Sequence, residues 1–218
     1  GEKIGENNWF DGKWVGGGVM ICVGLTGSIG MGKATTANMF AEAGFPVYDA
    51  DAEVHALYEK DGAAVGPLSE RVGDILKNGG IDRAALRAKV VDNPDAMKDL
   101  EAIVHPLVGL SQMKFRQQAL DTKKSFAVLD IPLLFETGGD ARCDHVTVVT
   151  APADVQKARV LQRGEMTAEE FENIRAKQMP DAEKRARADF VISTAFGFDF
   201  ARAHVQAIID LFDSLDAA

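Results

Sequence analysis

Met20-Ile-Cys-Val-Gly-Leu-Thr-Gly-Ser-Ile-Gly-Met-Gly-Lys33 is the most informative stretch of the sequence. Residues 20–26 form a short apolar run of the kind that predicts a buried strand. A glycine-rich turn follows over residues 27–32, and from Lys33 the apolar residues take a helical spacing up to Gly44. Glycines allow backbone N–H groups to turn inward, and the start of a helix adds partial positive charge. This order predicts a phosphate-binding loop; the alternative is a plain structural turn.

Lys33 supplies the point charge that such loops place on the β- and γ-phosphates of a nucleotide. The next position normally carries a hydroxyl that ligates Mg²⁺, but this chain has Ala34 there. Thr35 is a poor substitute, because one step along a helix rotates the side chain by about 100°. We therefore expect ATP binding through the backbone and Lys33 to persist, and metal positioning to be weakened.

Further apolar runs predict buried strands farther along the chain. They lie at residues 45–48, 125–130, 145–150 and 190–192. Nearly continuous apolar strands that alternate with helices are typical of a parallel sheet covered on both faces. The sequence thus predicts an α/β fold.

The segments between these strands have helical character. Residues 53–118 carry no strand signal, so we expect an all-helical insertion between the second and third strands, with breaks at Gly62, Gly79-Gly80, Pro94 and Pro106. Another helix is predicted from Pro152 to Gly164, and Thr167-Ala-Glu-Glu170 has the pattern of a capping box that opens the next one. The last helix is expected to bury Ala201, Val205, Ile208, Phe212 and Leu215.

Composition excludes several classes of protein. The chain of 218 residues is 46% hydrophobic with a net charge of −9, so it can bury a core, and we expect no nucleic-acid partner. No apolar run reaches the length of about 18 residues that spans a membrane, and we expect no membrane partner. Cys22 and Cys143 predict no disulfide framework and a reducing compartment, and the four histidines are too scattered for a zinc site.

Residues 1–19 differ from the rest of the chain. They are rich in glycine and have neither the basic n-region nor the apolar h-region of a secretory signal. We expect this segment to be a leader or an extension outside the fold, and the protein to be cytoplasmic.

Carboxylates follow two of the predicted strands. Asp49 and Asp51 come directly after the second strand, and Asp130 ends the third. The carboxyl ends of parallel strands meet at one edge of the sheet, where the ligand crevice of such folds lies. There Asp51 can accept a proton from an attacking hydroxyl or hold Mg²⁺ through water, or it can simply cap a helix that starts at residue 52. Asp130 is either a carboxylate on the metal side or a strand-end cap.

A cluster of cations stands out in this acidic protein. Its members are Arg159, Arg163, Arg175, Lys177, Lys184, Arg185 and Arg187. One interpretation is a lid whose arginines stabilise transferring phosphates. The other is a solvated helical surface, balanced by Glu165, Glu169, Glu170 and Glu172.

Several of these motifs occur together in the order and spacing of a known family. They are Thr26-Gly-Ser-Ile-Gly-Met-Gly-Lys33, Asp49-Ala-Asp51, His105-Pro106, Pro132-Leu-Leu-Phe-Glu136, Arg159-x-x-x-Arg163, Gln178 and Ala188-Asp189-x-Val-Ile192. From residue 20 to about residue 197 the chain resembles the dephospho-CoA kinases. The resemblance implies a P-loop NTPase fold, with a parallel five-stranded sheet flanked by helices, a helical substrate-binding insertion and a helical lid. It also implies transfer of the γ-phosphoryl group of ATP, with Mg²⁺, to the ribose 3′-hydroxyl of dephospho-CoA, the last step of coenzyme A biosynthesis.

The resemblance further implies roles for single residues. Those expected to bind ATP are Gly27, Gly30, Met31, Gly32, Lys33, Ala34, Thr35 and Arg159. Those expected to act in catalysis are Asp51, Lys33 and Arg163. Those expected on the substrate side are Asp51, His105 and Pro106, and those expected on the metal side are Asp51 and Asp130.

We expect one kinase domain over residues 20–218, acting on a small molecule as a monomer or weak homo-oligomer. Its core would comprise residues 20–52, 123–158 and 188–218, its insertion residues 53–122, and its lid about residues 159–187.

Two departures from the family pattern define the alternatives. Ala34 replaces a hydroxyl residue, so one alternative is a nucleotide-binding protein with weak or lost catalysis. Residues 193–197 stand where the family often has an Asp-Asn pair, so we assign no adenine contact to them. Another nucleoside or nucleotide kinase is the second alternative. A GTPase switch is excluded, because the chain has no Asn-Lys-x-Asp segment.

Overall fold

A computed structural model describes residues 8–10, 13–15 and 20–216. The chain divides into two compact units. The first comprises Gly1–Tyr48 and Arg116–Ala218, and the second comprises Asp49–Phe115. Each unit is described by itself below.

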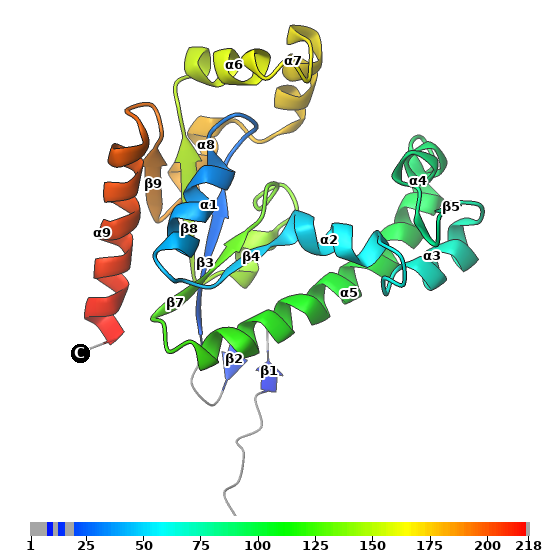
Figure 1. Cartoon of the computed structure of the whole chain (residues 1–218), viewed down its shortest axis with the longest axis horizontal. Coiled ribbons are helices and arrows are strands. Elements are labelled where there is room, and N and C mark those ends of the chain that lie inside the picture. Colours follow the sequence, from blue (N-terminus) through cyan, green and yellow to red (C-terminus); the bar gives the residue numbers. More distant parts are fainter. Residues whose placement is uncertain (1–7, 11–12, 16–19, 217–218) are drawn as a thin grey trace, which may run out of the picture. The chain divides into compact units, whose positions relative to one another are not determined.

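A five-stranded sheet is the centre of the first unit (Figure 1). Its strands, in spatial order, are β4 (Val47–Asp49), β7 (Phe126–Asp130), β3 (Ile21–Thr26), β8 (His145–Thr150) and β9 (Phe190–Ser193). The central strand β3 pairs in parallel with β7 and β8, and β8 pairs in parallel with β9. The predicted α/β fold and parallel sheet are confirmed. Strands β3, β7 and β8 are buried as predicted, whereas the edge strands β4 and β9 are only partly buried.

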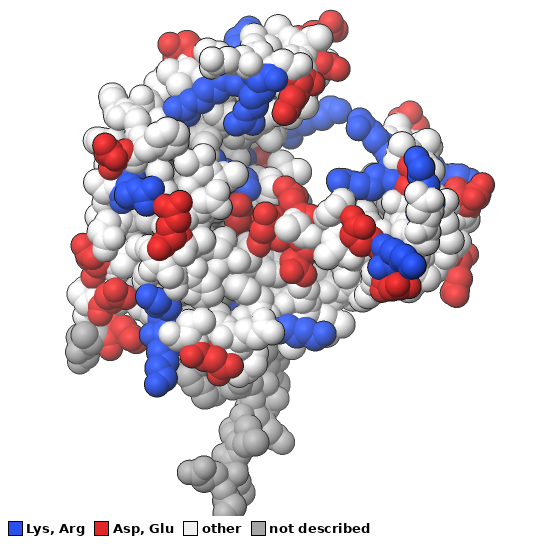
Figure 2. All heavy atoms as spheres, in the orientation of Figure 1, with Lys and Arg blue, Asp and Glu red and all other residues white. Residues whose placement is uncertain are grey.

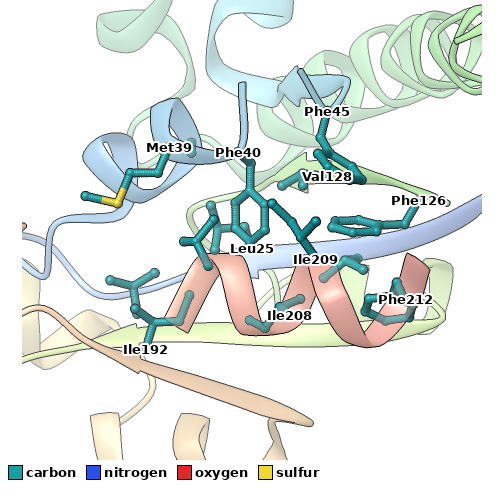
Figure 3. Packing of buried hydrophobic residues seen from close by; sticks show 14 of the residues in the cluster. Leu25, Met39, Phe40, Phe45, Phe126, Val128, Ile192, Ile208, Ile209 and Phe212 are labelled. Atoms are coloured by element: carbon teal, nitrogen blue, oxygen red, sulfur yellow. The ribbon is translucent and has the colours of Figure 1, made fainter. Parts of the chain in front are cut away.

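Helices α1 (Lys33–Glu42) and α9 (Phe198–Asp216) cover one face of this sheet (Figure 1). Phe126 of β7 is fully buried at the centre of their shared core. Its ring centroid lies 4.5 Å from that of Phe45, 4.9 Å from that of Phe212 and 5.9 Å from that of Phe40. Figure 3 shows these rings beside Phe126. Because Phe40 lies in the last turn of α1 and Phe212 in α9, the contacts hold both helices against the sheet.

The predicted buried face of the last helix is right at four positions and wrong at Leu215, which is 62% exposed. Ile209, which we did not assign to that face, is buried instead. The cause is length: the 19 residues of α9 span about 28 Å, whereas a six-residue strand such as β8 spans about 20 Å. The last turn of the helix therefore extends past the core.

Shorter elements lie along the rest of the first unit. They are the 3₁₀ turn η1 (Gly139–Arg142) and helices α6 (Ala153–Gln162), α7 (Ala168–Lys177) and α8 (Asp181–Arg187). A second core joins Leu134 and Phe135 to the β8 residues Val146 and Val148. The predicted capping box is confirmed, because the Thr167 hydroxyl accepts from the Glu170 amide and the Glu170 carboxylate accepts from the Thr167 amide.

The second unit is helical with one exception. Its helices are α2 (Ala50–Tyr58), α3 (Val65–Val72), α4 (Arg83–Val90) and the greater part of α5 (Pro94–Asp121). They enclose a core that includes Leu68, Leu86 and Val104. The expectation of an all-helical insertion is wrong, because β5 (Leu76–Lys77) and β6 (Gly80–Ile81) form an antiparallel hairpin.

Asn78 and Gly79 make the turn of this hairpin, and both have positive φ angles, 54° and 86°. Asn-Gly is the preferred sequence for a two-residue hairpin turn that needs positive φ at both positions. The glycines that we took for a helix break were therefore part of a hairpin signal.

Two short strands lie in the N-terminal segment. β1 (Asn8–Phe10) and β2 (Lys13–Val15) pair with each other in an antiparallel sheet of their own. The rest of residues 1–19, and with it most of our expectation about that segment, lies outside the described residues. None of the helices in the described parts of the chain is both long and apolar enough to cross a membrane.

Candidate active site

The loop between β3 and α1 has the backbone geometry of an anion-binding turn. Gly30 and Gly32 have φ angles of 76° and 92°, a left-handed conformation that residues with a Cβ seldom adopt. A Cβ on Gly30 would also lie 2.5 Å from a methyl carbon of Val160. Glycine is therefore required at these two positions, as the sequence pattern predicts.

Five backbone N–H groups of the loop and the first turn of α1 have no hydrogen-bond partner among the described residues. They belong to Gly30, Gly32, Lys33, Ala34 and Thr35. Unpaired N–H groups at the start of a helix bind anions, because they donate hydrogen bonds and the helix dipole favours negative charge. The predicted phosphate-binding loop therefore has unpaired N–H donors available for an anion. A plain structural turn would not account for them.

The Lys33 ammonium contacts the Asp130 carboxylate at the end of β7. Asp130 is only 4% exposed, and the Lys33 side chain is 18% exposed. The two residues are 97 positions apart, and the parallel register of β3 and β7 brings their ends together. Sequence reasoning placed Asp130 at this edge of the sheet but did not foresee that it would hold the lysine.

Three residues in the first turn of α1 differ in what their side chains can reach. Ala34 and Thr35 are exposed, whereas Thr36 is fully buried and its hydroxyl donates to the Gly32 carbonyl oxygen at 3.1 Å. Thr35 lines a pocket of about 370 Å³ beside the loop. Its hydroxyl is therefore the accessible one in this turn.

The same pocket is lined by backbone of the phosphate-binding loop and by a cationic and an aromatic side chain. Gly30 and Gly32 form its phosphate-loop side, and Arg159 and Phe198 are among its other lining residues. The Arg159 guanidinium donates to the Thr194 hydroxyl at 2.8 Å and to the Thr194 carbonyl oxygen at 2.7 Å, which fixes its plane. A pocket that joins unpaired N–H groups to an arginine and an aromatic ring suits a nucleotide.

Thr194 is a site residue that sequence reasoning missed. Besides holding Arg159, its hydroxyl donates to the Met31 carbonyl oxygen at 2.8 Å, so one side chain links the loop to α6. It lies within residues 193–197, to which we assigned no adenine contact. No local sequence signal would have found it, because its partners are 35 and 163 positions away.

The structure separates the cation cluster into two groups. Four members form ion pairs: Arg175 with Glu172, Lys184 with Glu136, Arg185 with Asp181, and Arg187 with Asp140. The other three, Arg159, Arg163 and Lys177, form no ion pair with any described residue. Of these, Arg163 lies at the end of α6, is exposed and lines the pocket. Figure 2 shows Lys and Arg side chains beside α6, with Asp and Glu side chains near α7.

Asp49 and Asp51 have different positions on α2. Asp49 is the N-cap, and its carboxylate accepts from the Ala52 amide at 3.0 Å. Asp51 lies in the first turn, is exposed, and makes no hydrogen bond or ion pair with any described residue. Asp49, not Asp51, is therefore the helix cap. The Asp51 carboxylate has no structural partner among the described residues and is available to a ligand.

His105 and Pro106 are exposed neighbours inside helix α5. Pro106 has no N–H group, so it cannot donate to the carbonyl oxygen of Ala102 one turn earlier. This exposed helical surface therefore offers the His105 imidazole to a polar ligand.

Comparison with known proteins decides the family. A sequence profile of the dephospho-CoA kinases matches residues 21–197. The chain belongs to the dephospho-CoA kinase family. A dephospho-CoA kinase from Mesorhizobium japonicum is 54% identical over 191 residues, which are 88% of this chain and 96% of that protein. One from Nitrobacter winogradskyi is 51% identical over 190 residues, covering 87% of this chain and 94% of that protein.

Solved structures agree with the family assignment. The protein TT1252 of Thermus thermophilus is similar with a TM-score of 0.75 and 32% identity, over 88% of this chain and 97% of that one. The dephospho-CoA kinase of Campylobacter jejuni has a TM-score of 0.63 and 28% identity, over 87% of this chain and 95% of that one. A dephospho-CoA kinase is a P-loop kinase, so family membership also implies the use of ATP.

Proposed function

We propose that the chain transfers the γ-phosphoryl group of ATP to the ribose 3′-hydroxyl of dephospho-CoA, giving coenzyme A and ADP. The observation that carries this proposal is the set of five unpaired N–H groups beside Lys33 in a chain of this family. Family membership supplies the acceptor, and the loop supplies the means of holding the donor.

On the donor side, the loop amides and Lys33 bind the β- and γ-phosphates. Phosphoryl transfer involves little covalent chemistry for the protein, so positioning and charge neutralisation supply most of the catalysis. Arg159 and the pocket beside it take the nucleoside, and Arg163 places its free guanidinium on the oxygens of the transferring group. The supporting observation is that Arg163, unlike its paired neighbours, has no carboxylate partner in the described chain.

On the acceptor side, Asp51 accepts the proton of the 3′-hydroxyl. The 3′ oxygen then forms a bond to the γ-phosphorus, and the bond to the β–γ bridging oxygen breaks, so that ADP leaves with that electron pair. An exposed carboxylate with no structural partner suits this task. His105 and Pro106 bind the substrate through the exposed polar groups of α5.

The residues at the loop fit a magnesium ion, although described residues form no cluster of three or more carboxylate, histidine or cysteine ligands. Mg²⁺ prefers oxygen ligands and keeps several waters. Asp130 and the exposed Thr35 hydroxyl supply such oxygens, directly or through water, and Ala34 supplies none. When bound, the ion would neutralise charge on the β- and γ-phosphates.

A coupled ADP-release assay tests the proposal. Purified protein is given ATP and Mg²⁺ with dephospho-CoA, adenosine or shikimate as acceptor. We expect ADP release that depends on dephospho-CoA and is near background with the other two acceptors. ADP release with adenosine would favour another nucleoside kinase. Nucleotide binding without turnover would favour a protein that has lost catalysis through Ala34.

A further inference from the structure

The phosphate-binding loop is held from outside at Ile29, a residue with no assigned role. The Ile29 amide donates to Oε1 of Gln178 at 3.1 Å. The Ile29 carbonyl oxygen accepts from Nε2 of Gln156 at 2.7 Å. Both polar groups of one loop residue are thus bonded to glutamine side chains, from positions 127 and 149 residues away.

These bonds give the side-chain amides of Gln156 and Gln178 polar partners in the places where the fold puts them. Gln156 is on α6 and is only 3% exposed, although burying an amide without a partner costs about 1–3 kcal/mol. Gln178 is the C-cap of α7. The next residue is fixed too, because the Met179 amide donates to the Glu136 carboxylate at 2.8 Å.

The backbone groups of Ile29 are bonded to protein side chains, whereas the neighbouring N–H groups of the loop are unpaired among the described residues. The Ile29 N–H points to Gln178, away from the site, whereas the N–H groups of Gly30 and Gly32 have no protein partner in the described chain. Adjacent N–H groups converge on an anion only in particular backbone conformations. Fixing the peptide groups of Ile29 restrains the rotation of the Gly30 peptide, which would otherwise be free.

The two glutamines also flank residues 157–177, the first part of the expected lid, which includes Arg159 and Arg163. Gln156 precedes Arg159 and Arg163, and Gln178 follows the end of α7. The two residues that flank residues 157–177 are therefore both bonded to Ile29 of the loop. A change in the loop on binding phosphate would be transmitted to both ends of this segment.

We propose that Gln156 and Gln178 are positioning residues that clamp Ile29, keep the loop amides directed at the ATP phosphates, and couple the loop to the arginine-bearing lid. The inference rests on the proposed use of this loop for ATP. It assigns neither glutamine a contact with the reacting atoms.

The clamp makes an asymmetric prediction. Gln178 acts through its oxygen, so Gln178→Glu keeps an acceptor for the Ile29 amide. Gln156 acts through its nitrogen, so Gln156→Glu puts a carboxylate oxygen against the Ile29 carbonyl oxygen. Both variants add the same charge next to the same residue, so a general effect of charge on ATP binding is matched between them. Gln118→Glu, at an exposed position on α5, is the control for the substitution itself.

The readouts are ATP affinity by calorimetry without acceptor, and hydrogen exchange of the Ile29 amide by NMR. We expect Gln156→Glu to weaken ATP binding about tenfold or more relative to Gln178→Glu, the effect of leaving a buried polar group without its partner. The Ile29 amide should stay protected in Gln178→Glu and exchange faster in Gln178→Met. If Gln156→Glu does not fold, Gln156→Met removes the donor without adding charge and should also weaken ATP binding.

Equal ATP affinity in the two glutamate variants, or equal Ile29 exchange in Gln178→Glu and Gln178→Met, would overturn the clamp. Neither readout requires an acceptor. The clamp can therefore fail while transfer to dephospho-CoA stands, and the acceptor assignment can fail while the clamp stands.

Discussion

Single side chains divide the work at the start of α2. Asp49 caps the helix, and Asp51, two residues later, is exposed without a partner in the described chain. The spacing of Asp51 fits either a cap or a catalytic carboxylate, and the family resemblance favours catalysis. The structure assigns the cap to Asp49, so variants at Asp49 and Asp51 test the capping and catalytic roles separately.

Asp51→Asn should lower kcat by about 10²-fold or more, because a general base contributes on that order. ATP affinity should change less, and the melting temperature should stay near that of the unmodified chain. Asp49→Ala is the matched variant: it should lower the free energy of unfolding by about 1 kcal/mol, the usual effect of losing an N-cap, and retain most of the turnover per folded molecule. The assignment fails if Asp51→Asn loses stability and keeps its kcat.

Lys33→Ala should lower phosphoryl transfer by about 10²-fold or more, because it removes a preorganised charge from the phosphates. The structure adds a second effect, since the ammonium also faces the buried Asp130 carboxylate. The free energy of unfolding should fall by about 1–3 kcal/mol. Activity and chemical denaturation measured on one sample separate the two effects. Unchanged activity would show that this loop does not hold ATP.

Ala34→Ser should raise kcat and lower the Mg²⁺ concentration for half-maximal rate, the latter by about tenfold. The position is exposed in the first turn of α1, so a serine fits without displacing a neighbour. The dephospho-CoA KM should change little, because position 34 belongs to the phosphate-binding loop and not to the acceptor side. Rate is measured against Mg²⁺ for both proteins. Coincident curves would mean that other groups already complete the coordination of the metal.

Among the elements, α8 is anchored by one buried ion pair. Lys184 is fully buried, and its ammonium lies 2.9 Å from the carboxylate of Glu136 in the segment after β7. Burial alone would raise the pKa of Glu136, but the Lys184 partner and the Met179 amide outweigh burial and hold that pKa below its ordinary value of 4.5. The pair therefore makes the stability of this region dependent on pH.

The sign follows from the direction of that shift. A carboxyl whose pKa is lower in the folded state stabilises the fold above its unfolded pKa, and this contribution is lost as the pH falls through the lowered value. Below about pH 4.5 the melting temperature of the unmodified chain should thus fall more steeply than that of Glu136→Gln. At pH 7 the variant should be about 3 kcal/mol less stable, because Lys184 is left buried without its partner. Glu136→Gln/Lys184→Met should recover part of that loss; parallel pH profiles would contradict this role.

The elements also show what a single sequence can and cannot predict. The five strands of the main sheet were predictable because each is a short apolar run between turn residues. The hairpin at Asn78-Gly79 was missed because its strands are two residues long and carry no alternation. Leu215 was misplaced because periodicity describes the face of a helix but not where the core ends.

The candidate site was predictable to the extent that it is local in sequence. The loop from Gly27 to Lys33 is one continuous motif, and its free amides follow from glycine positions and the start of a helix. The contacts of Asp130 with Lys33, Thr194 with Met31 and Gln156 with Ile29 join residues 97, 163 and 127 positions apart, and only the fold brings them to the loop. The identity of a residue alone does not predict which distant residue it contacts.

In the molecule as a whole, the two compact units have separable chemistry. The unit with the five-stranded sheet carries the phosphate-binding loop, its pocket and the proposed lid residues, whereas the unit of Asp49–Phe115 carries Asp51, His105 and Pro106. We propose that together they join the γ-phosphoryl group of ATP to the 3′ oxygen of dephospho-CoA. Identifying the product of the reaction tests this function directly.

Protein, ATP, Mg²⁺ and dephospho-CoA are incubated, and the products are analysed by mass spectrometry and ³¹P NMR. We expect one new phosphate monoester on the ribose 3′-hydroxyl, formed in equal amount to ADP, in a product identical to coenzyme A. ADP without a phosphorylated acceptor, or a phosphate on any other hydroxyl, would contradict this function.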